Sequence, residues 1–472
     1  LSESCRNMLK LTESNMDQMG RDRFIMALRV GIVSLGCAKN LVDSEIILGR
    51  LREEGCEIVA DAHDADYIIV NTCGFIGPAK EESIETILEM AALKQQGSCR
   101  GLIVAGCMIQ RYPEELFEEL PEVDGFLGTN DLDKVGKLIE GIQQGKRLLL
   151  RGEELYDYNQ PSPRILATLH HFAYLKVAEG CSHQCAFCVI PQIRGKFRSR
   201  TVESIVSEAE ALYASGVKEL ALVAQDTTAY GRDLKNAGLA DLLRELLPIG
   251  FDWLRILYTY PTSLGEDILK LMRDNESLVK YVDLPLQHVS QAVLRAMGRP
   301  GDYQSTLDLI QRIREHIPGV FIRSSFIVGF PGETEEDFES LLRFLEEAKL
   351  NHVGIFQYSP EEGSRAALFD NQVPDDEKER RFNEAMAVQQ RISRELNERL
   401  VGEEIDVMID GVSEESDLVL IGRHQGQAPE VDGLVYMGMP VDPPQAGDIV
   451  KVRILEAHAY DLVGEVLGRE HS

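Results

Sequence analysis

Three cysteines lie close together in the segment EGCSHQCAFCVIP, at Cys181, Cys185 and Cys188. Structural zinc takes four protein ligands, and 4Fe–4S clusters normally take four cysteines. The segment offers only three cysteines, with His183 as the nearest additional ligand. A 4Fe–4S cluster on three cysteines leaves one iron without a protein ligand. We expect this open iron to bind a co-substrate, with zinc as the competing metal.

A second set of three cysteines is spread over the first part of the chain. Cys37, Cys73 and Cys107 follow the apolar runs VGIVSL, YIIVN and LIVA, which predict strands. In open α/β sheets the carboxyl ends of the strands line the ligand crevice. We therefore expect the three thiols to form one site, although buried structural cysteine is the common alternative for any single position. No role is predicted for Cys5, Cys56 or Cys99.

Alternating strand and helix patterns predict the elements that position both sets, and the fold class is α/β. An open parallel sheet with helices is expected first, and then a partial (β/α)6 barrel with chemistry at the carboxyl ends of its strands. Five short strands separated by Gly, Pro and Asp predict a small antiparallel β-barrel at the end. The predicted division is 1–27 disordered extension, 28–145 α/β domain, 146–171 linker, 172–400 barrel with a trailing helix, and 401–472 β-barrel.

Composition limits the classes of function. The net charge of −29 gives a surface that repels phosphate backbones. No run of 18 apolar residues occurs, so no membrane span is expected. Nine cysteines thinly spread over 472 residues do not form a secreted disulfide framework. We expect a cytoplasmic protein.

The spacing Cys-x-x-x-Cys-x-x-Cys, with Phe187 before the last cysteine and a barrel strand before the loop, resembles the radical S-adenosylmethionine family. The resemblance implies that the open iron binds the amino and carboxylate groups of S-adenosylmethionine. Its cleavage yields methionine and a 5′-deoxyadenosyl radical. FIVGFPGET resembles the motif that binds the adenine side, with Gly329 and Gly332 allowing close backbone approach. A helix start with Thr334 as N-cap explains the same residues.

Two glutamines also end barrel strands and are candidate cofactor or substrate contacts. Gln225 lies in ALVAQDTTAYG, and Gln287 lies in LPLQHVSQAVLRAMGR. Polar residues are common at strand ends, so the interpretation competes with an ordinary structural one. Beyond the six cluster ligands we predict no catalytic residue.

The segments SLGCAKNLVDSE, NTCGFI and AGCM, together with the barrel loop and the β-rich tail, resemble the methylthiotransferases. This family implies a second 4Fe–4S cluster on Cys37, Cys73 and Cys107, and a substrate-binding TRAM domain as the tail. The segments GCAKNLVDSE, NTCGFIGPAKEESIE and QAPEVDGLVY resemble the branch of the family that modifies an aspartate of small-subunit ribosomal protein S-twelve.

For this branch the resemblance implies two S-adenosylmethionine molecules per turnover. One methylates a sulfur at the second cluster, and the other yields the radical that removes hydrogen from the β-carbon of the aspartate. The partners implied are ribosomal protein S-twelve or the small ribosomal subunit, and an electron donor such as flavodoxin or ferredoxin.

The charge of the tail tests the choice of substrate. Residues 401–472 contain 15 acidic and 4 basic residues, a net charge of −11. Such a module repels RNA and attracts a basic protein, which makes transfer RNA an unlikely partner. The basic stretch RGKFRSR opposes this view, and we interpret it as flanking the mouth of the active site. Methylthiolation of a transfer-RNA adenosine and a zinc-bound ribosome-assembly factor are the alternatives.

Overall fold

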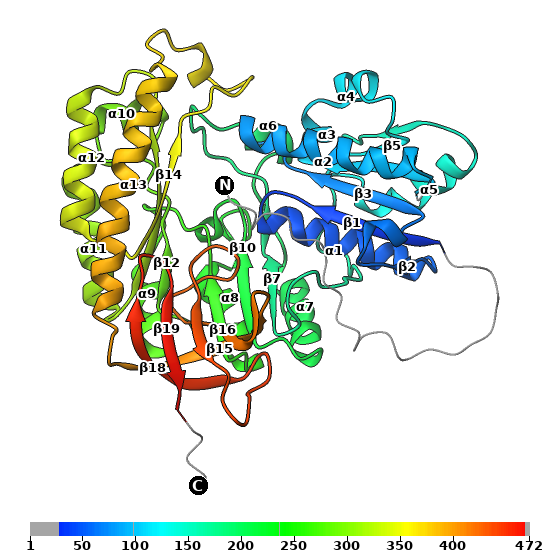
Figure 1. Ribbon diagram of the computed structural model, residues 1–472. Helices are drawn as coiled ribbons and strands as arrows, with labels where there is room; N and C mark the ends of the chain where they lie inside the picture. The colour runs from blue at the N-terminus through cyan, green and yellow to red at the C-terminus, as the bar shows by residue number, and fades with distance from the viewer. Residues whose placement is uncertain (1–27, 98, 236, 468–472) are drawn as a thin grey trace. The chain divides into compact units, whose positions relative to one another are not determined.

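The computed structural model describes residues 28–97, 99–235 and 237–467, and its contacts divide the chain into two compact units (Figure 1). Of the described residues, the first unit holds those up to Leu169 together with Tyr174–His183 and Val189–Glu208. The second holds His170–Ala173, Gln184–Cys188 and the chain from Ala209. The predicted extension 1–27 and Cys5 lie outside the described residues.

The first unit is built on a six-stranded sheet with the order β2-β1-β3-β4-β5-β6, in which every pairing is parallel. The open parallel sheet is therefore confirmed. β3 and β4 are buried along their whole length, as expected for strands covered by helices on both faces. The strands are β1 (Arg29–Ser34), β2 (Glu57–Ile58), β3 (Tyr67–Thr72), β4 (Gly101–Gly106), β5 (Gly125–Leu127) and β6 (Leu148–Leu150).

Helices cover both faces of this sheet. α1 packs against α5, whereas α2, α3 and α4 share a core with the strands on the other side. The helices are α1 (Ala38–Glu53), α2 (Gly77–Gln95), α3 (Cys107–Arg111), α4 (Pro113–Glu119) and α5 (Val135–Gln143). β6 lies beyond the predicted domain boundary at 145. The three leucines between Arg147 and Arg151 are too short an apolar run to predict a strand. They form one because they pair with β5.

The six predicted barrel strands are all present, and the partial barrel is confirmed. They form two three-stranded sheets, β11-β10-β7 and β12-β13-β14, and a single bridge joins Leu254 to Leu278 between β11 and β12. The strands are β7 (Phe172–Lys176), β10 (Glu219–Val223), β11 (Trp253–Ile256), β12 (Tyr281–Asp283), β13 (Phe321–Val328) and β14 (His352–Gln357). The helices after them are α7 (Val202–Ala214), α8 (Leu239–Leu246), α9 (Glu266–Asp274), α10 (Gln291–Met297), α11 (Tyr303–His316) and α12 (Glu335–Ala348).

The trailing helix α13 (Asp375–Glu398) leads into a closed five-stranded barrel with the order β15-β16-β17-β19-β18. Four pairings are antiparallel as expected, but β17 and β19 run parallel. They have the same direction because β18, which runs the opposite way, lies between them in the chain. The strands are β15 (Glu404–Ser413), β16 (Ser416–His424), β17 (Val435–Gly438), β18 (Ile449–Ala457) and β19 (Leu462–Val466). No described helix has the length and apolar character needed to cross a membrane.

Candidate active site

Cys37, Cys73 and Cys107 follow β1, β3 and β4, which are neighbours in the sheet, so the parallel register brings the three loops to one edge. Glycines let these loops approach. A Cβ built on Gly36 would lie 3.2 Å from the Sγ of Cys73, and one on Gly74 would lie 3.0 Å from the carbonyl carbon of Cys107. The predicted convergence of the three cysteines therefore fits the arrangement of the loops.

Two polar side chains fix the loops. The side-chain amide of Asn40 donates to the carbonyls of Leu35 (2.7 Å) and of Asn71 and Thr72 (3.3 Å each), and so ties the ends of β1 and β3 together. The backbone N–H of Cys73 donates to the hydroxyl of Ser83 on α2 at 3.1 Å. Sequence reasoning did not single out either residue, although an asparagine three positions after a cysteine at a helix start was an available signal.

The electrostatics of the three thiols differ. Burial raises the pKa of Cys73 to about 12, and the neighbouring Cys107 and Cys37 add to the shift. Burial also raises the pKa of Cys107, although Arg194 opposes it. Desolvation also acts to raise the pKa of Cys37. Lys39, Arg194 and two backbone N–H groups outweigh it, so the pKa of this thiol is lowered. Binding of a metal group must therefore displace protons from Cys73 and Cys107.

The arrangement of these thiols bears on the kind of metal group they fit. Within the described residues, no group of three or more His, Cys, Asp or Glu side chains is placed to hold a single metal ion. A zinc ion needs its ligands around one centre. A 4Fe–4S cluster binds each thiolate through a different iron, and a cluster on these three thiols stays a prediction.

The loop of Cys181, Cys185 and Cys188 runs from β8 (Ala178–Glu179) to α6 (Ile190–Arg194). On the side of the first unit, Gly180 has φ +76° and a Cβ there would meet the carbonyl oxygen of Lys196 at 2.3 Å. The N–H of Cys181 donates to the carbonyl of Gly195 at 3.1 Å. A pairing of β8 with β9 (Arg198–Ser199) closes this base of the loop.

On the side of the second unit, the N–H of Ala186 donates to the carbonyl of Met297 at 2.7 Å. Phe187, a predicted cofactor contact, packs at the edge of a core cluster that includes Ala186, Met297 and Phe330. Arg299 lies beside this loop, with its guanidinium 3.9 Å from the Sγ of Cys185 and stacked over Tyr260 at 4.4 Å. Arg299 was not predicted, because its sequence position gives no sign of a thiol neighbour.

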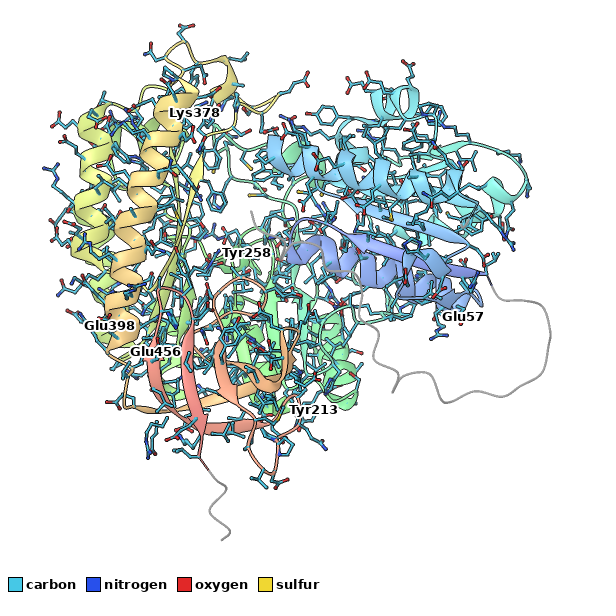
Figure 2. The ribbon with its side chains drawn as sticks, viewed as in Figure 1. Glu57, Tyr213, Tyr258, Lys378, Glu398 and Glu456 are labelled. Carbon is cyan, nitrogen blue, oxygen red and sulfur yellow. The ribbon has the colours of Figure 1, made fainter. Side chains whose placement is uncertain are left out.

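The other predicted contacts also lie after barrel strands. Gly329 directly follows β13 with φ +73°, and a Cβ there would lie 2.3 Å from the Cγ of Lys378, which Figure 2 places near the start of α13. Packing against α13 is one reason for a glycine here, and a contact of Gly329 with the cofactor stays a prediction. Gly332 has φ +84° and open space around it, and the expected N-cap is present, since Thr334 accepts from the N–H of Asp337.

Gln225 follows β10 and is half-buried. Gln287 follows β12 and has φ +74°, a conformation that non-glycine residues adopt rarely and that clusters at functional sites. A bridge to Phe326 holds its backbone. The role of both glutamines remains a prediction.

The basic stretch RGKFRSR carries fewer unpaired cations than its sequence suggests. Arg194 is buried in ion pairs with Asp43 and Glu179, and Arg200 is buried against Glu208. Two of its cations are thus neutralised by acids inside the first unit, and a place for the stretch at the mouth of the active site stays a prediction. The sequence shows the charges of a stretch but not the acids that fold against them.

Comparison with known proteins gives the family. The model of the radical SAM superfamily matches residues 175–345, that of uncharacterized protein family UPF0004 matches 29–128, and that of the TRAM domain matches 401–467. Structures of the radical S-adenosylmethionine methyltransferase TsrM from Kitasatospora setae share the fold. One aligns with a TM-score of 0.51 over 78% of this chain and 89% of that chain, at 16% identity.

Curated relatives match nearly the whole chain. Ribosomal protein uS12 methylthiotransferase RimO of Desulforamulus reducens is 48% identical over 93% of this chain and 99% of its own length. The protein of the same name from Geobacter sulfurreducens is 47% identical over 93% of this chain and 98% of its own. This chain is therefore a radical S-adenosylmethionine methylthiotransferase and belongs to the ribosomal protein uS12 methylthiotransferase family.

Proposed function

We propose that this enzyme attaches a methylthio group to the β-carbon of an aspartate in ribosomal protein uS12, with S-adenosylmethionine and two 4Fe–4S clusters. The name of the relatives supports the target protein. The observation that carries the proposal is the presence of two three-cysteine sets, one in the UPF0004 region and one at the start of the radical SAM region. Each set is one ligand short of a closed cluster.

The residues of this chain hold and orient the two groups. When bound, the cluster on Cys181, Cys185 and Cys188 supplies the electron that cleaves S-adenosylmethionine, and the one on Cys37, Cys73 and Cys107 supplies a sulfur-binding iron. Asn40 and Ser83 fix the loops of the second set. Arg299 places a positive charge beside Cys185. The electron must come from outside, and we propose flavodoxin or ferredoxin as its donor.

The charges of the β-barrel support a basic protein as the substrate. In its described part, residues 401–467, each basic side chain is paired with an acid. Arg423 is buried between Glu219 and Asp410, Lys451 pairs with Asp406, and Arg453 pairs with Glu404 and Glu465. These paired cations contribute little to binding the phosphate backbone of an RNA. A basic ribosomal protein would instead be attracted to the excess of acids.

The turn between β15 and β16 combines charge with exposed apolar surface. It carries the acids Glu414 and Glu415, and the start of β16 adds Asp417 and Leu418, which is 74% exposed. An apolar side chain within a charged rim can contribute to a protein interface, and acids attract a basic partner. We propose that this turn contributes to the docking of uS12.

The test is an anaerobic reaction of the full chain with uS12 and, separately, with transfer RNA. Cys185→Ala should abolish formation of 5′-deoxyadenosine. Cys73→Ala should abolish thiolation and leave some uncoupled cleavage. Methylthiolation of transfer RNA but not of uS12 would contradict the proposed substrate. Normal deoxyadenosine formation by Cys185→Ala, or a purified protein with zinc and no iron or sulfide, would contradict the proposed chemistry.

A further inference from the structure

Arg194 contacts the second set of cysteines from an unexpected part of the chain. It is the last residue of α6 and lies six residues after Cys188. Its Nη2 donates to the Sγ of Cys107 at 3.1 Å and to the Oδ1 of Asn40 at 3.2 Å. Its Nη1 donates to Asp43 at 2.6 Å and to Glu179 at 3.1 Å. One guanidinium group thus binds two carboxylates, an amide and a sulfur.

These carboxylates belong to a buried cluster of charges. Lys176 pairs with both Asp43 and Glu179, and its ammonium group lies 3.0 Å from the phenol of Tyr158. The side chains of Asp43, Lys176, Glu179 and Arg194 are all at most 5% exposed. Two acids and two bases balance one another, so the cluster tolerates burial. A guanidinium group held this way cannot turn away from Cys107.

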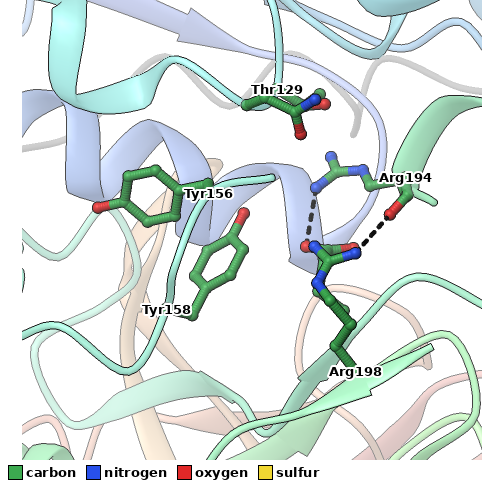
Figure 3. Close-up of a pocket in the computed structure, with 7 residues that line it drawn as sticks. Thr129, Tyr156, Tyr158, Arg194 and Arg198 are labelled. Atoms are coloured by element: carbon green, nitrogen blue, oxygen red, sulfur yellow. Dashed lines mark hydrogen bonds and ion pairs between the residues drawn. The ribbon is translucent and has the colours of Figure 1, made fainter. Parts of the chain in front are cut away.

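Burial keeps solvent from the guanidinium group of Arg194, because only 3% of the side chain is exposed. Arg194 also lines a hollow of about 180 Å³ that is partly open to solvent, together with residues that include Tyr156, Tyr158 and Arg198 (Figure 3). Away from water the attraction between a cation and a thiolate is stronger than at the surface. Arg194 is therefore well placed to stabilise negative charge on Cys107.

We propose that Arg194 is a positioning residue for the metal group on Cys37, Cys73 and Cys107, and that its charge raises the reduction potential of this group. Reduction adds negative charge to a cluster, and a buried cation beside a ligand sulfur favours the reduced state. Glu179 and Arg194 flank the other cysteine loop in the chain, so the same contacts link the two loops. The inference rests on the proposed second cluster.

The test uses the full chain with C181A, C185A and C188A together, which leaves one cysteine set. Iron and sulfide content is measured first, and then the midpoint potential by a redox titration followed by electron paramagnetic resonance. Arg194→Gln should make the potential more negative, and Arg194→Lys should restore it in part. Arg198→Gln is the matched control, because Arg198 loses the same charge but donates to the backbone carbonyls of Arg194 and Lys196.

The possible outcomes separate the two proposals. Absence of iron and sulfide in the parent would overturn the second cluster, and this role of Arg194 with it. A cluster whose potential is the same with Arg194→Gln, or shifts equally with Arg198→Gln, would overturn the role of Arg194 alone. If Arg194→Gln does not fold, Glu179→Gln decides. It removes an acid that shares the guanidinium group, so the potential should become less negative, and no shift or the opposite one would refute the inference.

Discussion

At the scale of single residues, the space left by one glycine decides whether two of the three strand-end thiols can meet. Gly36 has φ +92°, in the left-handed region that favours glycine. A Cβ there would also lie 2.8 Å from the Cβ of Cys73, closer than side chains can approach. A larger residue at this position must therefore displace Cys73, a predicted metal ligand.

Gly36→Ala should weaken retention of iron by the Cys37, Cys73 and Cys107 set about ten-fold, the loss typical of disturbed support around metal ligands. Gly55→Ala is the matched control, because Gly55 also has positive φ (+88°) but a Cβ added there would have no atom within 4 Å. Both changes should cost about 1–2 kcal/mol of folding stability through the backbone. Iron content in the chain lacking the other three cysteines is the measurement, and equal iron in the two variants would show that the contact with Cys73 is unimportant.

At the scale of elements, buried charges join the C-terminal barrel to the catalytic barrel within the second unit. Asp410 on β15 accepts from His171 at 2.8 Å and pairs with Arg423 on β16. Arg423 also pairs with Glu219 on β10 at 2.6 Å. Burial opposes the charges on Asp410 and Glu219, but the arginines outweigh it and lower both pKa values. These contacts hold the two barrels as one body near neutral pH.

His424, the last residue of β16, makes this junction sensitive to acid. Burial, with nearby His352 and Arg255, lowers its pKa to about 3, and its Nδ1 accepts from the N–H of Gly426. The unfolded chain binds a proton below about pH 6.5 and the folded chain does not, so stability falls as the pH drops from about 6.5 towards 3. The loss at pH 5 should be about 2 kcal/mol.

Urea unfolding at pH 7 and pH 5 tests this expectation. The fluorescence of Trp253, the single tryptophan and a buried residue of β11, reports on the second unit. His424→Asn keeps an acceptor for Gly426 and should remove about 2 kcal/mol of the pH dependence. If the wild-type chain and the variant lose the same stability between the two pH values, His424 does not carry the effect.

The same scale shows what the sequence could predict. Apolar runs in the sequence predicted the strands of the six-stranded sheet and of the partial barrel. Because Cys37, Cys73 and Cys107 each follow one of these strands, the sequence also predicted that they lie at one edge of the sheet. Local patterns did not show β6, which depends on pairing with β5, or the parallel contact between β17 and β19. They also missed the burial of Arg194, since its acids come from α1 and β8. The pattern of residues within one segment does not predict which distant segment it contacts.

At the scale of the whole molecule, a net charge of −29 favours basic partners. Charge alone does not say where such a partner binds, because the acids are spread over both units. The turn between β15 and β16 combines three acids, Glu414, Glu415 and Asp417, with the highly exposed Leu418. If uS12 docks at this turn, its binding should depend on the charge of the turn. If uS12 is only attracted to the acidic chain as a whole, its binding should depend on the net charge of the chain.

Charge reversal at two places separates these possibilities. E414K/E415K/D417K reverses the turn, and E114K/E115K/E118K makes the same change in total charge on the exposed face of α4. With intact uS12 as substrate, the turn variant should lower kcat/KM about ten-fold or more, because like charges at an interface cost several kcal/mol. The α4 variant should change it little, and added salt should narrow the difference as it screens the charges. Equal losses in the two variants would mean that only the total charge matters, and no loss in either would place the docking surface elsewhere.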